Sequence, residues 1–281
     1  MSRIRIVKKT QIEQITRPPA VAGTFYPAEA RQLGRMVESF LEDARVDSKD
    51  APKAIIAPHA GYIYSGPVAG SAFRCWAGTE AGARRIVILG PSHWVEFDGI
   101  ALPRATVFST PLGDVPLDND AIHDLRSLPQ VVEFDPAHAR EHCVEVELPF
   151  LQITGWKFRI VPLVIGEATD EEVCEVIDRL WGGAETRFVI SSDLSHYLDY
   201  AAASRIDAAT AKAIEQGKAQ ELTTDHACGF RAIRGFLLGA RARGVAVSTV
   251  DLRNSGDTAG SRDRVVGYGA FHLREAKSQA G

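Results

Sequence analysis

Four short segments of the chain are apolar at almost every position, and they predict the strands of a buried sheet. These segments are AIIA (54–57), RIVILG (85–90), FRIVPLVIG (158–166) and RFVISS (187–192). Strands that are covered on both faces have such continuous apolar runs. Stretches with helical spacing lie around Leu33–Leu41 and over 67–77, 171–181, 201–216 and 229–243. Strands that alternate with helices predict an α/β fold with a central, mainly parallel or mixed sheet flanked by helices.

The C-terminal part of the chain adds two closing strands, VSTVDLRN (247–254) and VVGYGAFHL (265–273). The polar, Gly-rich segment between them predicts a long hairpin loop or flap. Repeats, low-complexity tracts and clear linkers are absent from the sequence. We therefore predict a single domain over residues 17–274, preceded by an extension (1–16) and followed by a short tail (275–281).

The composition narrows the class of protein. The chain has 281 residues, a net charge of −4 and scattered basic residues, which argues against a nucleic-acid partner. Its four cysteines form no Cys-x-x-Cys pair, which indicates free thiols in a reducing compartment. The basic N-terminus lacks the apolar core of a signal peptide, and no apolar run reaches the roughly 18 residues of a membrane helix. We expect a cytoplasmic protein without a membrane partner.

Two histidines follow predicted strands directly. His59 comes at the end of the strand in IIAPHAGYIYSG (55–66), and His93 follows the strand in RRIVILGPSHW (84–94). Ligands of open α/β sheets bind beyond the carboxyl ends of the strands. Because neutral imidazole is the commonest metal ligand in proteins, a shared metal ion is the simplest explanation for both. For His59 alone, a turn histidine that caps the next helix is the structural alternative.

A third strand end carries a polar cluster in RFVISSDLSHY (187–197). Asp193 can accept a hydrogen bond from a ring N–H and so fix a histidine tautomer. His196 can either bind the metal or act as an acid/base. A serine-hydrolase triad of Ser192, Asp193 and His196 is disfavoured, because triad members come from separate loops and no G-x-S-x-G elbow is present.

Two further segments contain candidate residues. In REHCVEVELPFL (140–151), His142 and Glu145 are three residues apart and can share one face of a helix that points into a cleft, or can simply belong to an amphipathic helix start. In DHACGFRAIRG (225–235), Cys228 precedes a predicted helix, whose N-terminus lowers a thiol pKa and favours a metal-binding thiolate. A small buried core residue is the alternative for Cys228, and we assign that role to Cys75, Cys143 and Cys174.

Taken together, the motifs PHAGYIYSG, LGPSH, EHCVEVELPF, ISSDLSH and ACG, in this order, resemble the Memo family, also called AmmeMemoRadiSam system protein B. The opening RPPAVAGTFYPA (17–28) is typical of its prokaryotic members, and the resemblance covers residues 17 to 273. It implies a fold similar to that of class III extradiol dioxygenases. It also implies a metal site made of His59, His93 and Cys228.

The resemblance implies roles for neighbouring residues as well. His196 takes the place of the dioxygenase acid/base, with Asp193 beside it. We place His142, Glu145, Tyr62 and Ser192 in the cleft or around the metal ligands. The dioxygenases use two histidines and a carboxylate, whereas a thiolate is softer and oxidisable, so ring cleavage does not transfer automatically.

Three functions follow as expectations. The first is a metal-dependent redox protein that holds iron or copper, acts on an unknown small molecule or peptide, and is linked to AMMECR-type and radical-SAM proteins. The second is a non-catalytic peptide- or protein-binding module, although the sequence shows no arginine cluster of the kind that grips phosphates. The third is a zinc hydrolase that activates water at an open coordination position.

Overall fold

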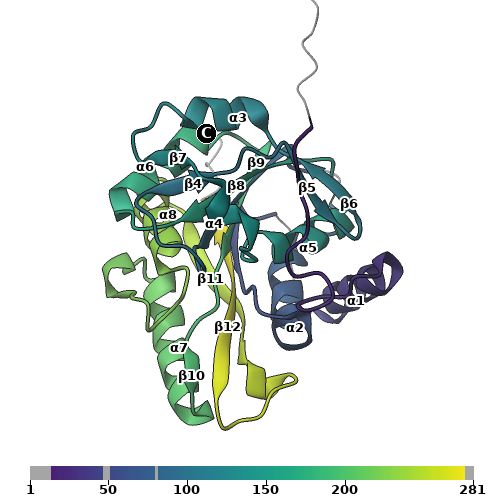
Figure 1. Ribbon diagram of the computed structural model, residues 1–281. Helices are drawn as coiled ribbons and strands as arrows, with labels where there is room; N and C mark the ends of the chain where they lie inside the picture. The colour runs from purple at the N-terminus through teal and green to yellow at the C-terminus, as the bar shows by residue number, and fades with distance from the viewer. Residues whose placement is uncertain (1–13, 47–50, 80–81, 276–281) are drawn as a thin grey trace, which may run out of the picture.

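The computed structural model describes residues 14–46, 51–79 and 82–275, and a nine-stranded mixed sheet runs through its centre (Figure 1). Most of the predicted extension (1–13) and tail (276–281) lies outside the described residues. The strands follow one another across the sheet in the order β10 (His196–Leu198), β12 (Val265–Arg274), β2 (Ala54–Ala57), β9 (Thr186–Ser191), β3 (Arg85–Pro91), β8 (Arg159–Ile165), β4 (Ile100–Leu102) and β7 (Val131–Glu133). Strand β11 (Ala246–Asn254) pairs with β12 outside this path.

The four central strands β2, β9, β3 and β8 are parallel to one another. They coincide, within a residue or two, with the four apolar runs of the sequence, and their side chains are buried on both faces. Strand β12 is antiparallel to β2, and β4 is antiparallel to β8. The α/β class and the mixed sheet are therefore confirmed.

Helices cover this sheet on both sides (Figure 1). Helices α1 (Ala30–Asp43), α2 (Tyr62–Phe73) and α5 (Leu148–Ile153) pack together on one side. Helices α6 (Asp170–Leu180) and α8 (Phe230–Ala242) pack against each other on the opposite side, and α7 (Tyr200–Glu215) lies along the β11–β12 hairpin. The short helices α3 (Asn119–Leu125) and α4 (Asp135–Ala139) precede and follow β7 in the chain, and α4 packs against β4. None of the helices in the described ranges is long and apolar enough to cross a membrane.

A smaller three-stranded sheet and short 3-10 turns complete the fold. The small sheet consists of β1 (Thr16–Arg17), β5 (Val107–Thr110) and β6 (Gly113–Pro116). The turns are η1 (Glu145–Glu147), η2 (Ala219–Glu221) and η3 (Ser255–Asp257). The predicted flap is the connection between β11 and β12 (255–264), which contains η3, and the two strands pair with each other over most of their length.

Two predicted helices have different boundaries in the structure. The helix predicted over 67–77 begins five residues earlier, at Tyr62, and includes Gly66 and Pro67. A Cβ atom at Gly66 would lie 2.2 Å from the ring of Phe40, so this glycine allows α1 and α2 to approach closely and does not form a turn. In the segment 140–151, only Leu148 onward is α-helical, and His142 lies in irregular backbone before η1.

His272 on β12 makes the stability of the fold depend on pH. Its side chain is fully buried, and Nε2 lies 3.0 Å from the carbonyl oxygen of Ala72. Burial lowers its pKa from 6.5 to about 4, against the hydrogen bond to Ala72. The unfolded chain therefore binds a proton between pH 6.5 and 4 that the folded chain does not, and stability is lost as the pH falls through this range.

We expect His272→Gln to remove this loss. Because one pKa unit corresponds to about 1.4 kcal/mol, the free energy of unfolding of the variant relative to wild type should rise by about 3 kcal/mol between pH 7 and pH 4. Urea denaturation at several pH values measures the difference. His123→Gln, at an exposed position, controls for the chemistry of the substitution. A difference between variant and wild type that does not change with pH would contradict the assignment.

Candidate metal centre

The candidate site lies at the carboxyl ends of three neighbouring parallel strands. His59, Asp193 and His93 each stand two residues beyond the end of their strand, β2, β9 and β3 respectively. Strand β9 pairs with both β2 and β3, so the three strand ends meet at one edge of the sheet. The rings of His59 and His93 lie close together at this edge, with their centroids 5.1 Å apart.

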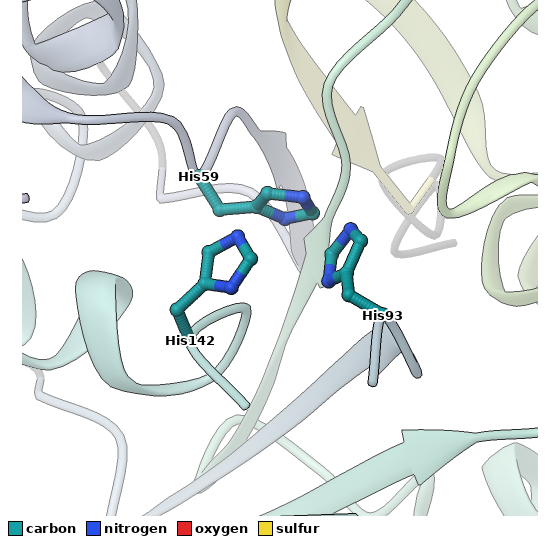
Figure 2. A group of neighbouring side chains, drawn as sticks. All are labelled: His59, His93 and His142. Carbon is teal, nitrogen blue, oxygen red and sulfur yellow. The ribbon is translucent and has the colours of Figure 1, made fainter. Parts of the chain in front are cut away.

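A third imidazole, that of His142, completes a cluster with these two (Figure 2). One ring nitrogen of each histidine lies within 4.8 Å of the other two, and the rings face a common point. The ring of His142 is stacked on that of His93 at 4.5 Å and lies 5.3 Å from that of His59. Because metal–nitrogen bonds are about 2.0–2.1 Å long, small side-chain movements would bring these nitrogens onto one ion. The cluster therefore has the composition of a metal site.

Hydrogen bonds hold the rings in place through their Nδ1 atoms. Nδ1 of His93 lies 2.8 Å from Oε1 of Glu141, and Nδ1 of His59 lies 2.8 Å from the hydroxyl of Ser191. A carboxylate that accepts from one ring nitrogen leaves the other nitrogen free to bind a metal. The Nε2 atom of His93 is therefore available as a ligand.

Sequence reasoning missed Glu141, although it stands beside His142 in the EHC motif. Its carboxylate is buried and accepts from Nδ1 of His93 and from the backbone N–H groups of His93, His142 and Cys143, at 2.7 to 3.0 Å. Burial alone would raise the pKa of Glu141, but the hydrogen bond and charge of His93 lower it to about 2. The position of Glu141 in that motif was the only available signal, because its partners are set by tertiary contacts.

The electrostatic surroundings favour neutral rings at His59 and His142. Burial lowers the pKa of His59 well below 6.5, and the neighbouring histidines lower it further. Burial also lowers the pKa of His142, to about 4, against the charge of Glu141. At His93, burial is the largest effect and acts in the same direction, but the hydrogen bond and the charge of Glu141 together outweigh it and raise the pKa. Since metal ligands must be deprotonated, His59 and His142 need lose no proton at neutral pH.

Cys228 lies next to His59, but the group of ligand atoms that all lie within 4.8 Å of one another contains His59, His93 and His142 and not Cys228. Its sulfur is 3.2 Å from Nε2 of His59 and accepts from the backbone N–H of Asp193 at 3.3 Å. The expected lowering of its pKa by the N-terminus of α8 was wrong. Burial raises the pKa of this thiol, and the charge of Asp193 raises it further. A bound cation would reverse this effect, because a coordinating thiol is deprotonated.

Asp193 has a different partner from the one expected. Its Oδ1 accepts from the backbone N–H of His59 at 2.8 Å, whereas Ser191 contacts the ring. Ser192 accepts from the backbone N–H of Gly229 at 2.9 Å, and so joins the end of β9 to the turn that carries Cys228. Asp193 therefore fixes the backbone at His59, and Ser192 fixes the backbone directly after Cys228.

His196 lines a cleft of about 430 Å³ together with His93 and Cys228. Phe97, Phe230 and Arg231 contribute to its wall. This placement agrees with a role for His196 beside the ligands, and the acid/base role stays a prediction. A larger groove of about 950 Å³ lies at the amino-terminal ends of β3 and β8 and includes none of the candidate site residues.

Tyr62 and Glu145 support the site from within the core. The hydroxyl of Tyr62 donates to the carbonyl oxygen of Val146 at 2.6 Å, and its ring packs against Phe150. Glu145 is fully buried and forms an ion pair with Arg17, so its carboxylate does not face the cleft. Their positions are those of scaffolding residues beneath the histidine cluster.

Gly229 allows the turn after Cys228 to pack against β9. A Cβ atom at this position would lie 2.7 Å from Cβ of Ser192 and 2.8 Å from the backbone oxygen of Ser191. We expect Gly229→Ala to reduce the free energy of unfolding by about 1–3 kcal/mol, the usual cost of overpacking. Chemical denaturation measures this cost.

Gly34→Ala in α1 is the matched control for this change. Its nearest neighbour would be Cδ2 of Leu112 at 3.9 Å, an ordinary contact. Alanine should therefore be neutral or stabilise by up to about 1 kcal/mol at this helical position. Equal effects of the two substitutions would contradict the packing argument.

The chain is similar to known proteins over nearly its whole length. Residues 17–272 match the family model of Memo-like proteins. MEMO1 family proteins of Ignicoccus hospitalis, Methanococcus maripaludis and Aquifex aeolicus are 35%, 33% and 33% identical to it. The alignments cover 91%, 92% and 90% of this chain and 98%, 100% and 97% of those proteins. The chain therefore belongs to the Memo family.

Proposed function

We propose that the protein binds a transition-metal ion through His59, His93 and Cys228 and uses it in redox chemistry. The observation that carries the proposal is that His59 and His93 belong to one cluster of imidazole nitrogens, and that the sulfur of Cys228 lies beside Nε2 of His59. Two ligands of one ion lie about 3–4 Å apart, given metal–ligand bonds of about 2.0–2.3 Å. The 3.2 Å between Nε2 of His59 and Sγ of Cys228 agrees with this range. His142 is a further candidate ligand, because its ring nitrogen lies within 4.8 Å of those of His59 and His93.

The donor set favours some metals over others. Imidazole nitrogens suit iron, copper and zinc, and a thiolate favours copper and zinc over magnesium or calcium. Iron or copper supplies electron-transfer or oxygen chemistry when bound, whereas zinc supplies Lewis acidity. We favour iron or copper, because the resemblance of the motifs extends to a dioxygenase-like fold. His196 would hold or deliver a proton for a substrate in the adjoining cleft.

Elemental analysis of anaerobically purified protein tests the proposal. We expect close to one iron or copper per chain, and loss of most of it in His93→Ala and in Cys228→Ser. Cys174→Ser, outside the site, should keep the full metal content. His142→Ala decides whether the third imidazole is also a ligand. Wild-type protein without stoichiometric metal, or undiminished metal after both substitutions, would refute the site.

Oxygen uptake, measured with and without added catechols, tests the redox part of the proposal. Turnover-dependent uptake that is lost in His196→Ala, with metal retained, would support the acid/base role. Bound zinc without oxygen uptake would instead favour hydrolysis, with the same residues around an activated water.

A separate observation, a set of exposed hydrophobic side chains, supports a docking function. Ile63, Tyr64, Trp94 and Tyr197 are large exposed hydrophobic residues, and each lies within five residues of His59, His93 or His196 in the chain. Aromatic side chains that are exposed near a cleft are typical of binding surfaces. Titration with phosphotyrosine peptides and their unphosphorylated forms tests this candidate, and the absence of saturable binding to either would remove it.

A further inference from the structure

The hydroxyl of Ser191 lies between three polar groups beneath His59. It is 2.6 Å from the carbonyl oxygen of Cys143, 2.8 Å from Oε1 of Glu147 and 2.8 Å from Nδ1 of His59. A serine hydroxyl has one hydrogen to donate and two lone pairs that accept. The three contacts are therefore satisfied together only if one partner accepts and the other two donate.

The identity of the accepting partner follows from chemistry. A carbonyl oxygen cannot donate, so the single hydrogen of Ser191 must go to Cys143. Nδ1 of His59 and Oε1 of Glu147 must then each carry a proton. We propose that Glu147 is held as a neutral carboxylic acid, which acts through Ser191 to fix the tautomer of His59 with its proton on Nδ1.

The surroundings of Glu147 support this assignment. Its side chain is about 1% exposed, and it forms no salt bridge with any residue in the described ranges. Oε2 is buried without a hydrogen-bond partner among those residues, which is far costlier for an ionised carboxylate than for the C=O of an acid. Its titratable neighbours include Asp193, Tyr62 and Cys143, and none of these three is a cation. Burial accordingly raises the pKa of Glu147 well above its usual range.

The arrangement makes Ser191 and Glu147 positioning residues for His59. With the proton on Nδ1, the lone pair of His59 is on Nε2, which faces Cys228. Rotation or a change of tautomer would break the bond to Ser191, whose hydrogen-bonding capacity is otherwise filled. The protonation of Glu147 does not depend on a metal. Only its consequence for metal affinity rests on the proposed function.

Infrared spectroscopy of the metal-free protein tests the proton on Glu147. We expect the wild-type spectrum minus that of Glu147→Gln to contain the C=O stretch of a protonated carboxylic acid at pH 8. Glu133→Gln, on β7, replaces a carboxylate that is paired with Arg104 and Arg126 and should give only carboxylate bands in the same subtraction. A Glu147 difference spectrum that contains carboxylate bands and no acid band would overturn the proposal.

Nitrogen-15 NMR of His59 tests the tautomer in the same metal-free sample. We expect the Nδ1–H form in wild type and a mixture of tautomers in Ser191→Ala. An Nε2–H tautomer in wild type would overturn the assignment, whatever the metal content of the protein.

Metal affinity measures the consequence for the site. Loss of a hydrogen bond that orients a metal-binding histidine weakens binding by about 10–100-fold, which we expect for Ser191→Ala. Ser71→Ala, at a buried serine in α2 that bonds to Asp251, should bind as wild type. If wild type binds no metal, the proposed function fails while the two spectroscopic results still decide the proton positions.

Discussion

Glu145→Gln is expected to lower the free energy of unfolding by about 3–5 kcal/mol, the usual cost of breaking a buried ion pair by removing one partner. The carboxylate of Glu145 is fully buried and accepts from Arg17, from the hydroxyl of Tyr26 at 2.5 Å, and from the backbone N–H groups of Ala20 and Val21 at 2.7 and 3.0 Å. A glutamine amide keeps the shape but turns its NH₂ group toward donors on one side. It also leaves the guanidinium of Arg17 buried without its counter-charge.

The effect should extend beyond stability to the histidine cluster. Arg17 also donates to the backbone oxygens of His138 and Glu141, which links the N-terminal segment to the loop that carries Glu141 and His142. We expect Glu145→Gln to loosen this loop and to weaken metal binding as well. Chemical denaturation and metal titration of the same variant measure the two effects.

A double-mutant cycle with Arg17→Met separates the ion pair from the other hydrogen bonds. If the pair is the main contribution, the double variant should be less destabilised than the sum of the two single variants, because no unpaired charge remains. Additive effects of the two substitutions would contradict a direct coupling between Arg17 and Glu145.

The sequence was sufficient to predict those parts of the fold and site that depend on local patterns. The four parallel strands are apolar on both faces, and this alone located their boundaries to within a residue or two. Histidines directly after two of these strands had to lie at one edge of the sheet once β2, β9 and β3 were parallel neighbours. The general rule for ligand sites in α/β sheets therefore led to His59 and His93 without a structure.

The remaining parts depend on contacts between distant segments, which no local pattern encodes. Residues 140–147 do not form the predicted helix. Their backbone is held by Arg17 and by the carboxylate of Glu141, and this brings His142 onto His93. The predicted direction of the pKa shift of Cys228 was wrong for a similar reason. Burial beside Asp193 raises the pKa, and this outweighs the lowering expected from the helix N-terminus that the sequence shows.

Glu141→Gln is expected to weaken metal binding by about 10–100-fold, the range found when the partner of a metal-binding histidine is removed. The carboxylate of Glu141 receives four N–H donors, three at Oε1 and one at Oε2, so both of its oxygens accept hydrogen bonds. A glutamine keeps one oxygen, so its NH₂ group must face at least one of these donors. The ring of His93 also loses the negative charge that orients it.

Competition with a chromogenic chelator under anaerobic conditions measures the affinity. Glu133→Gln is the matched control, because it removes a carboxylate from β7 at the edge of the sheet, where Glu133 pairs with Arg104 and Arg126. This control should bind metal as wild type does. Thermal unfolding of the metal-free variants must accompany the titration, since a buried donor that loses its acceptor costs about 1–3 kcal/mol in stability. A folded Glu141→Gln protein with wild-type affinity would mean that the metal does not depend on His93, and the ligand set would then have to be built around His59, His142 and Cys228.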